Sequence, residues 1–252
     1  MIGMRRVAFI LGVLVMATHA HPADAAELKI FGSRVTRMVI GDIGPAYTQA
    51  TGNKLTVVTD VAAVMKRRIE GDEPLDIAVL VSFQVDDLIK KGKLLADSRA
   101  DVMRAGIGVA VRRGAPKPDI STVAAFKQAL LDAKSIVYLE EGASTLHLQK
   151  VLAQLGIADA LEAKTIKTSG ESVSEMVAAG DAELGIIVIP NILSVPGAEV
   201  VGPLPAELQS YITFTAAVSP TSPNQPAARD VIKLMQSPAG VESIKKNGME
   251  PG

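Results

Sequence analysis

The stretch LKIFGSRVTRMVIGDIGPAYTQATGNKLTVV, residues 28–58, carries the pattern that decides the fold. Short apolar runs in it predict strands, and the segment between them has apolar residues at helical spacing. The predicted strand, helix and strand occupy residues 28–31, 36–50 and 55–58. A further helix and strand follow at residues 62–70 and 77–81. This alternation predicts a parallel sheet with helices on its faces.

The same alternation returns in the second half of the chain, after a break rich in Gly and Pro at residues 112–118. The predicted elements there are residues 136–139, 144–155, 164–167, 172–179 and 184–189. Two helices without an intervening strand follow at residues 227–236 and 238–246, the second with Ser237 as its N-cap and Gly248 as its stop. The two series predict two α/β lobes, and we expect the terminal helices to return to the first lobe.

The N-terminal segment has the composition of a secretory signal. Arg5 and Arg6 precede an apolar run at residues 7–17, and a small-residue site, Ala23-Asp24-Ala25, follows. The run is too short to span a membrane as a helix. We therefore expect residues 1–25 to be a signal peptide and the protein to reach the periplasm.

Composition excludes several functional classes. The 252 residues include no cysteine, so disulfides, thiolate chemistry and Cys-ligated zinc are excluded. Basic and acidic residues are balanced, 26 against 27, without a basic block, and we expect no nucleic-acid partner. His147 is the only histidine outside the signal segment, and we expect no metal site and no cofactor. No nucleophile elbow or phosphate-binding loop is present.

Turns rich in oxygen side chains and glycine recur where predicted strands pass into helices. They are Gly32–Ser33, Glu141–Thr145 and Thr168–Ser172. In open α/β sheets, ligands bind beyond the carboxyl ends of strands, where helix N-termini offer unpaired N–H groups to anions. Such turns also serve as ordinary helix caps. Arg34 and Arg37, three residues apart, are either a fork for a carboxylate or two solvated surface residues.

Several motifs taken in order resemble the molybdate-binding periplasmic proteins of ABC importers. They are LKIFGS at residue 28, IEGDEPLDIAVLV at 69, LQKVLAQLGI at 148, AAGDAELGIIVIP at 178 and SPAGVESIKKNGMEP at 237. The resemblance implies a two-lobed type II periplasmic-binding fold with two crossover strands, near residues 106–111 and 211–218. We expect residues 26–108 plus 216–252 to form lobe 1 and residues 109–215 to form lobe 2.

The resemblance also indicates where a ligand binds, in the cleft between the lobes. Two hydroxyl contacts of the family fall on Val35 and about Ala62, and its tyrosine contact falls near Val188. With those groups lost and Arg34 beside them, we expect Arg34 to pair with a ligand carboxylate. The expected ligand-binding positions are Ser33, Arg34, Ala62, Ser144, Thr145, Ser169 and Gly170.

Three functions follow from these expectations. The first is a monomeric periplasmic binding protein that delivers a small anion, a molybdate-like oxyanion or an organic carboxylate, to an ABC permease and its ATPase. The second is a periplasmic isomerase of an unsaturated tricarboxylic acid, similar to aconitate isomerase, with Glu171, Glu141 or His147 as the proton carrier. The third is a receptor that reports the anion to a membrane sensor. For the favoured first function, no catalytic residue is expected.

Overall fold

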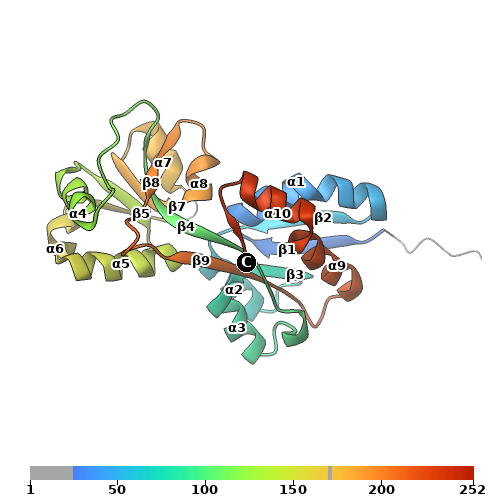
Figure 1. The fold of residues 1–252 in the computed structure, drawn as a ribbon. Helices are drawn as coiled ribbons and strands as arrows, with labels where there is room; N and C mark the ends of the chain where they lie inside the picture. Colours follow the sequence, from blue (N-terminus) through green and yellow to red (C-terminus); the bar gives the residue numbers. More distant parts are fainter. Residues whose placement is uncertain (1–24, 170–171) are drawn as a thin grey trace, which may run out of the picture.

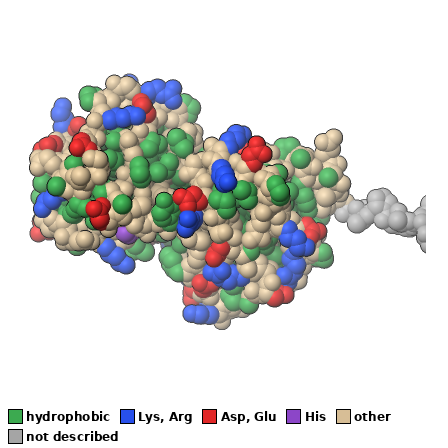
Figure 2. Space-filling model, viewed as in Figure 1, with side chains coloured by type: hydrophobic (Ala, Val, Ile, Leu, Met, Phe, Trp, Pro, Cys, Tyr) green, Lys and Arg blue, Asp and Glu red, His purple; other side chains and the backbone are tan. Residues whose placement is uncertain are grey.

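The computed structural model describes residues 25–169 and 172–252, so the predicted signal segment lies outside the described residues except for Ala25. Two bodies of strands and helices are joined by two long strands, β4 (Ala100–Arg112) and β9 (Tyr211–Val218) (Figure 1). The molecular surface narrows between the two bodies (Figure 2). The expected α/β class with two lobes and two crossover strands is thereby confirmed.

Lobe 1 is built on the strands predicted from the opening stretch: β1 (Glu27–Gly32), β2 (Lys54–Thr59) and β3 (Ile77–Val81). Strand β1 pairs in parallel with both β2 and β3, and β9 runs antiparallel to β3 and to β4. All five residues of β3 are buried, as expected for a strand covered on both faces. The parallel order places the carboxyl ends of β1, β2 and β3 at one edge.

Helices cover both faces of this sheet. They are α1 (Arg34–Thr51), α2 (Ala62–Glu70), α3 (Ser82–Lys90), α9 (Gln225–Gln236) and α10 (Pro238–Lys246), with a 3-10 turn at Ala96–Ser98 and a short strand β10 (Glu250–Pro251) on β4. The terminal helices do return to lobe 1, where α10 packs beside α1 (Figure 1). Asp42 of α1 accepts hydrogen bonds from Ser243 Oγ at 2.8 Å and from Lys246 Nζ at 2.9 Å. Ser237 caps α10 as predicted, accepting from Gly240 N at 3.3 Å.

Lobe 2 repeats the arrangement. Its strands are β5 (Ile136–Leu139), β6 (Thr165–Thr168), β7 (Leu184–Val188) and β8 (Ala198–Pro203), and its helices are α4 (Val123–Asp132), α5 (Ala143–Leu155), α6 (Ala158–Glu162), α7 (Val173–Ala179) and α8 (Ile189–Leu193). Strand β5 pairs in parallel with β6 and β7, whereas β7 and β8 run antiparallel to β4. Among the described residues of both lobes, no helix has the length and apolar character that a membrane span requires.

The passage from one lobe to the other occurs within β4. Its residues up to Gly106 pair with β9, and its residues from Ile107 pair with β7. At that point the side-chain amide of Gln209 accepts from Ile107 N at 3.1 Å and donates to Ile107 O at 2.9 Å, replacing a strand neighbour. The lobe boundaries given above, at residues 108 and 216, stay predictions, because backbone pairing alone does not divide two lobes that share strands.

Candidate functional site

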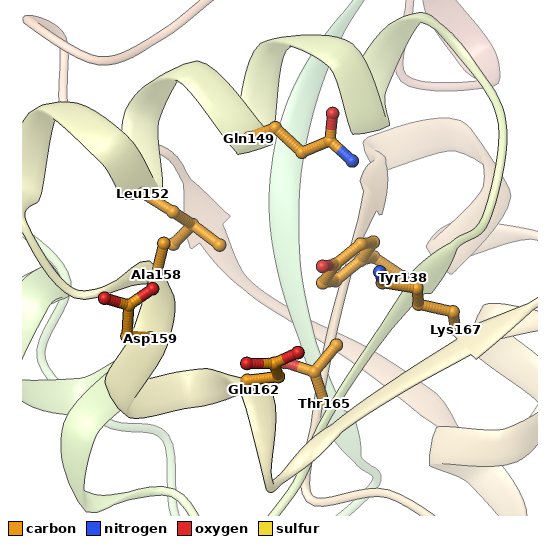
Figure 3. Close-up of a pocket in the computed structure, with 8 residues that line it drawn as sticks. All are labelled: Tyr138, Gln149, Leu152, Ala158, Asp159, Glu162, Thr165 and Lys167. Carbon is orange, nitrogen blue, oxygen red and sulfur yellow. The ribbon is translucent and has the colours of Figure 1, made fainter.

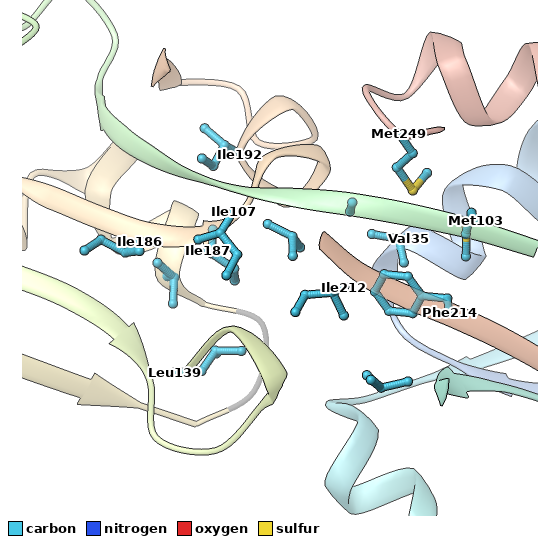
Figure 4. Close-up of a cluster of buried hydrophobic side chains, with 14 of the residues drawn as sticks. Val35, Met103, Ile107, Leu139, Ile186, Ile187, Ile192, Ile212, Phe214 and Met249 are labelled. Carbon is cyan, nitrogen blue, oxygen red and sulfur yellow. The ribbon is translucent and has the colours of Figure 1, made fainter. Parts of the chain in front are cut away.

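A small cavity, the inner cavity, lies where the two lobes meet. Its volume is about 70 Å³, and most of its walls are apolar. Val35 of α1 and Phe214 of the crossover strand β9 form one side, and Leu139 and Ile187 of lobe 2 form the other (Figure 4). Among the described residues that line it, none is Lys, Arg or His, and Glu141 is the one ionisable side chain.

The first turns of four helices converge on the inner cavity. Helices α1, α2, α3 and α5 begin directly after residues that line it: Ser33, Val61, Val81 and Gly142. The side chains of these four residues accept no capping bond, and at α1 the Thr36 hydroxyl accepts the N–H of Ser33 at 3.4 Å. The first N–H groups of a helix have no acceptor inside the helix, and the helix dipole is positive at that end. The converging turns therefore suit an anion held by neutral donors.

Buried side-chain atoms without partners face the same space. Within the described residues, four buried side-chain atoms have no hydrogen-bond partner, and two of them, Ser33 Oγ and Asn191 Oδ1, belong to residues that line the cavity. Asn191, on α8, is only 7 % exposed. A buried polar group without a partner costs about 1–3 kcal/mol. The two ends of an amide are interchangeable by rotation, so Asn191 can turn its N–H group to a ligand.

Ser144 adds a third polar group. It is 8 % exposed, lines the cavity from the first turn of α5, and its hydroxyl makes no hydrogen bond to a described residue. The turn before it needs a glycine, because Gly142 has φ 151° and ψ 168°, a conformation closed to other residues. Gly142 thus sets the direction in which α5 enters the cleft.

Two ion pairs cross between the lobes at the rim of the cleft. Arg34 of α1 donates to Glu175 Oε1 of α7 at 2.5 Å and to Ser194 Oγ at 3.4 Å. Arg67 of α2 reaches Glu141 Oε2 at 3.3 Å. The Arg34 side chain is 13 % exposed, whereas those of Arg67 and Glu141 are 60 % and 58 % exposed. The second pair is therefore the looser of the two.

The structure brings together part of the predicted site. Ser33, Ala62 and Ser144 all line the inner cavity. The two other hydroxyl positions do not: the Thr145 hydroxyl bonds Leu139 O at 2.8 Å, and Ser169 lines a neighbouring depression. Gly170 and Glu171 lie outside the described residues.

Arg34 lies at the rim of the cleft. It lines a separate depression with Arg37, Glu175 and Ser194, and it does not line the inner cavity. Glu175 occupies its guanidinium, so a ligand would have to displace a close cross-lobe pair to reach it. A contact between Arg34 and a ligand stays a prediction that this arrangement does not favour.

His147, weighed above as a proton carrier, does not line the cavity. Its Nε2 lies 2.7 Å from Leu208 O, which gives it a structural role between α5 and the segment before β9. Of the weighed groups that lie within the described residues, Glu141 lines the cavity and His147 does not.

The residues missed from the sequence are Asn191, Val81 and the pair Ile212 and Phe214. Asn191 directly follows the motif ending in Ile189-Pro190, so its position was in view, but the short helix α8 that turns it into the cleft was not predicted. Ile212 and Phe214 read as ordinary strand residues of β9. Nothing in an alternating strand shows which of its faces lines a cleft.

Other hollows and charge clusters lie elsewhere. A depression of about 530 Å³ between β5, α5, α6 and β6 is surrounded by Tyr138, Gln149 and Glu162 (Figure 3). It belongs to lobe 2 alone, so closure of the lobes cannot act on it. No group of three or more His, Asp or Glu placed to hold a metal ion occurs within residues 25–169 and 172–252.

The largest pKa shifts belong to the surface of lobe 1. Hydrogen bonds from Arg68 and then Lys29 lower the pKa of Glu73 to about 2. Bonds from Lys66 and then Lys91 lower the pKa of Asp87 to about 2. These pairs tie α2 and α3 to the rest of the lobe and take no part in the cavity.

Comparisons with known proteins show the family of the chain and a relative of nearly the same length. Residues 28–250 match the family model described as bacterial extracellular solute-binding protein. A curated relative from a Pseudomonas species, named aconitate isomerase, is 32 % identical over 251 residues, which cover 96 % of this chain and 95 % of the relative.

Solved structures with the same fold include the periplasmic molybdate-binding protein of Azotobacter vinelandii, with a TM-score of 0.75 and 18 % identity over 88 % of this chain and 98 % of that one. The sulfate-binding protein of Mycobacterium tuberculosis has a TM-score of 0.74 and 16 % identity over 90 % of this chain and 87 % of that one. These likenesses confirm the type II periplasmic-binding fold expected from the sequence. The chain belongs to the family of bacterial extracellular solute-binding proteins.

Proposed function

We propose that this protein binds a small organic carboxylate in the inner cavity. The observation that carries the proposal is the convergence of the first turns of four helices with two buried atoms that lack partners, Ser33 Oγ and Asn191 Oδ1. In a space with apolar walls, hydrogen bonds to an anion face little competition from water and are stronger than at the surface. A carboxylate would satisfy the donors that the protein leaves unpaired.

Two observations favour a carboxylate over a metal oxyanion. The relative named aconitate isomerase is 32 % identical over almost the whole chain, whereas the molybdate-binding structure is 18 % identical. Val35 and Ala62 also line the cavity without hydroxyl groups, so fewer neutral donors surround a tetrahedral ion.

The role we propose for this binding is uptake. The protein would be exported through its N-terminal segment to the periplasm, bind its ligand as a monomer, and present the closed form to a permease coupled to an ATPase. The arrangement of two lobes joined by β4 and β9 supports this proposal, since closure about such connections is a common hinge motion.

A second candidate is an isomerase of an unsaturated polycarboxylate, favoured by the name of the relative and by the position of Glu141. A carboxylate at the wall of an apolar cavity can remove a proton from a carbon next to a ligand carboxylate and return it elsewhere. The nearby helix N-termini would stabilise the negative charge that develops on the ligand carboxylate.

A thermal-shift and NMR experiment tests both candidates. The purified protein is melted with molybdate, sulfate, and mono-, di- and tricarboxylates, and each stabilising compound is then incubated with the protein and followed by NMR. A ligand at about 100 times its Kd stabilises the folded state by about 2.7 kcal/mol. Stabilisation by a carboxylate that stays unchanged supports uptake, and conversion that Glu141→Gln abolishes supports the isomerase. Stabilisation by molybdate alone contradicts both.

The matched variants are Ser33→Ala and Ser121→Ala. Ser33 lines the cavity with an unpartnered hydroxyl, whereas Ser121 is exposed on a loop of lobe 2. Only Ser33→Ala should weaken binding of the carboxylate. Equal affinities of the two variants would place the ligand outside the inner cavity.

A further inference from the structure

The inner cavity is too small for a whole polycarboxylate. Its volume is about 70 Å³, room for only a few water molecules. That space suits one carboxylate group or one tetrahedral oxyanion. In this arrangement of the lobes, any longer ligand has to continue into an adjoining space.

An adjoining space exists on the side of α2. A depression of about 480 Å³, the outer pocket, shares Val61 and Glu141 with the inner cavity. Its other lining residues include Asp60, Arg67 and Glu140. A ligand whose first carboxylate occupies the inner cavity would thus place its remainder beside Arg67.

Arg67 is the rim arginine that a ligand can take over. Its pair with Glu141 is 3.3 Å long and joins two side chains that are both more than half exposed. Charge-assisted bonds of this kind are usually about 2.7–2.9 Å long, and exposed pairs contribute little stability. Arg34, in contrast, is 13 % exposed, holds Glu175 at 2.5 Å and also bonds Ser194.

The other charges of the outer pocket narrow the choice of ligand. Asp60 and Glu140 also line it, but among the described residues only Glu141 lies within ion-pair distance of Arg67. Asp60 Oδ1 accepts the N–H of Val61 at 2.7 Å. An acidic pocket repels a diffuse anion, so a second anionic group is stabilised only where it reaches the guanidinium and takes the place of Glu141.

We propose that the ligand carries at least two carboxylates, the first bound by the inner cavity and the second by Arg67 in exchange for Glu141. This inference rests on the proposed carboxylate binding and adds the ligand class and a specificity-determining residue. The exchange also leaves Glu141 without its cation, beside the ligand carbon chain. An inorganic oxyanion would leave the outer pocket unused.

Isothermal titration calorimetry with matched probes tests the inference. The probes are propionate, succinate, propane-1,2,3-tricarboxylate and the zwitterion β-alanine, which has an ammonium group in place of the second carboxylate. The proteins are the wild type, Arg67→Met and the control Arg37→Met. Arg37 is exposed on α1 and bonds Thr59 Oγ1 at 3.2 Å, outside both spaces.

For the wild type we expect succinate or the tricarboxylate to bind about tenfold or more tightly than propionate, because Arg67 gives up its long pair with Glu141 for a shorter charge-assisted bond to the second carboxylate. Arg67→Met should remove that preference while still binding propionate, and Arg37→Met should match the wild type.

Equal wild-type affinities for propionate and the dicarboxylate, a preference for β-alanine, or an unaltered preference in Arg67→Met would each overturn the inference while leaving carboxylate binding intact. Absence of binding by all four probes would overturn the proposed carboxylate function itself.

Discussion

Asn191→Asp replaces a neutral amide by a carboxylate of nearly the same size on the wall of the inner cavity. A sphere of 70 Å³ is about 5 Å across, so the introduced charge and a bound carboxylate would lie about 5 Å apart. With an effective dielectric constant of about 20, their repulsion is about 3.3 kcal/mol, a loss of affinity of about 250-fold. The protein can limit this penalty by protonating the introduced group.

Because protonation of the introduced carboxyl limits the penalty, the loss of affinity depends on pH. Protonation from a reference pKa of about 3.9 costs about 4 kcal/mol at pH 7 but only about 1.5 kcal/mol at pH 5. The affinity ratio of wild type to variant should therefore fall from about 250 at pH 7 to about tenfold at pH 5. Calorimetry with propane-1,2,3-tricarboxylate, each variant compared with wild type at the same pH, measures the ratio.

Asn191→Leu is the control for this substitution, since it removes the amide without adding charge. Its loss of affinity should be the same at both pH values. If Asn191→Asp binds as tightly as wild type, or if both variants lose affinity without a pH dependence, Asn191 does not contact the ligand anion and the cavity is wrongly assigned.

Three further predictions concern the framework around the cavity. Gly142→Ala places a side chain on a residue with φ 151° and should lower the unfolding free energy by about 1–3 kcal/mol, measured by the melting temperature. It should also weaken ligand binding. An unchanged melting temperature would show that alanine is not strained at this position. Glu73→Gln removes the carboxyl whose pKa Arg68 lowers from 4.5 to about 2. The contribution of this carboxylate to folding stability is complete above about pH 4.5 and is lost as the pH falls toward 2. Denaturant melts should show the stability difference from wild type shrinking below about pH 4.5, and a constant difference would contradict this. Glu175→Gln weakens the pair with Arg34 and should lower the ratio of closed to open forms of the unliganded protein by up to about fivefold. Small-angle scattering should then give a larger radius of gyration. An unchanged radius would show that other contacts hold the lobes together.

The main elements of the fold could be read from periodicity. The predicted helix at residues 36–50 is α1 (Arg34–Thr51), and the one at 144–155 is α5 (Ala143–Leu155). Helices α3, α4, α6 and α8 were missed, and two of these misses have local reasons. Helix α3 begins at Ser82 directly after the buried strand β3, with no turn residue between them, and α8 is only five residues long. Strand β4 begins at Ala100, six residues before the predicted strand. Its first half was missed because it includes the polar residues Asp101 and Arg104.

The candidate site was only partly predictable. Ser33, Ala62 and Ser144 stand at strand-to-helix turns, which parallel topology gathers at one edge, so their sequence positions were sufficient. The orientation of Arg34 was not, because a side chain at the start of a helix can point into the cleft or along its rim. Its partner, Glu175, is 141 residues away in the chain.

By itself, the sequence determined the alternation of strands and helices, the two-lobed class and the turns at which ligand groups gather. These features depend on residue type and short-range spacing, which the sequence states directly. Only the tertiary structure decided that Asn191 and Phe214 face the cavity, that Glu175 occupies Arg34, and that Arg67 borders a second space. Those facts depend on how one lobe is set against the other, and contacts between residues far apart in the chain leave no periodic signal in it.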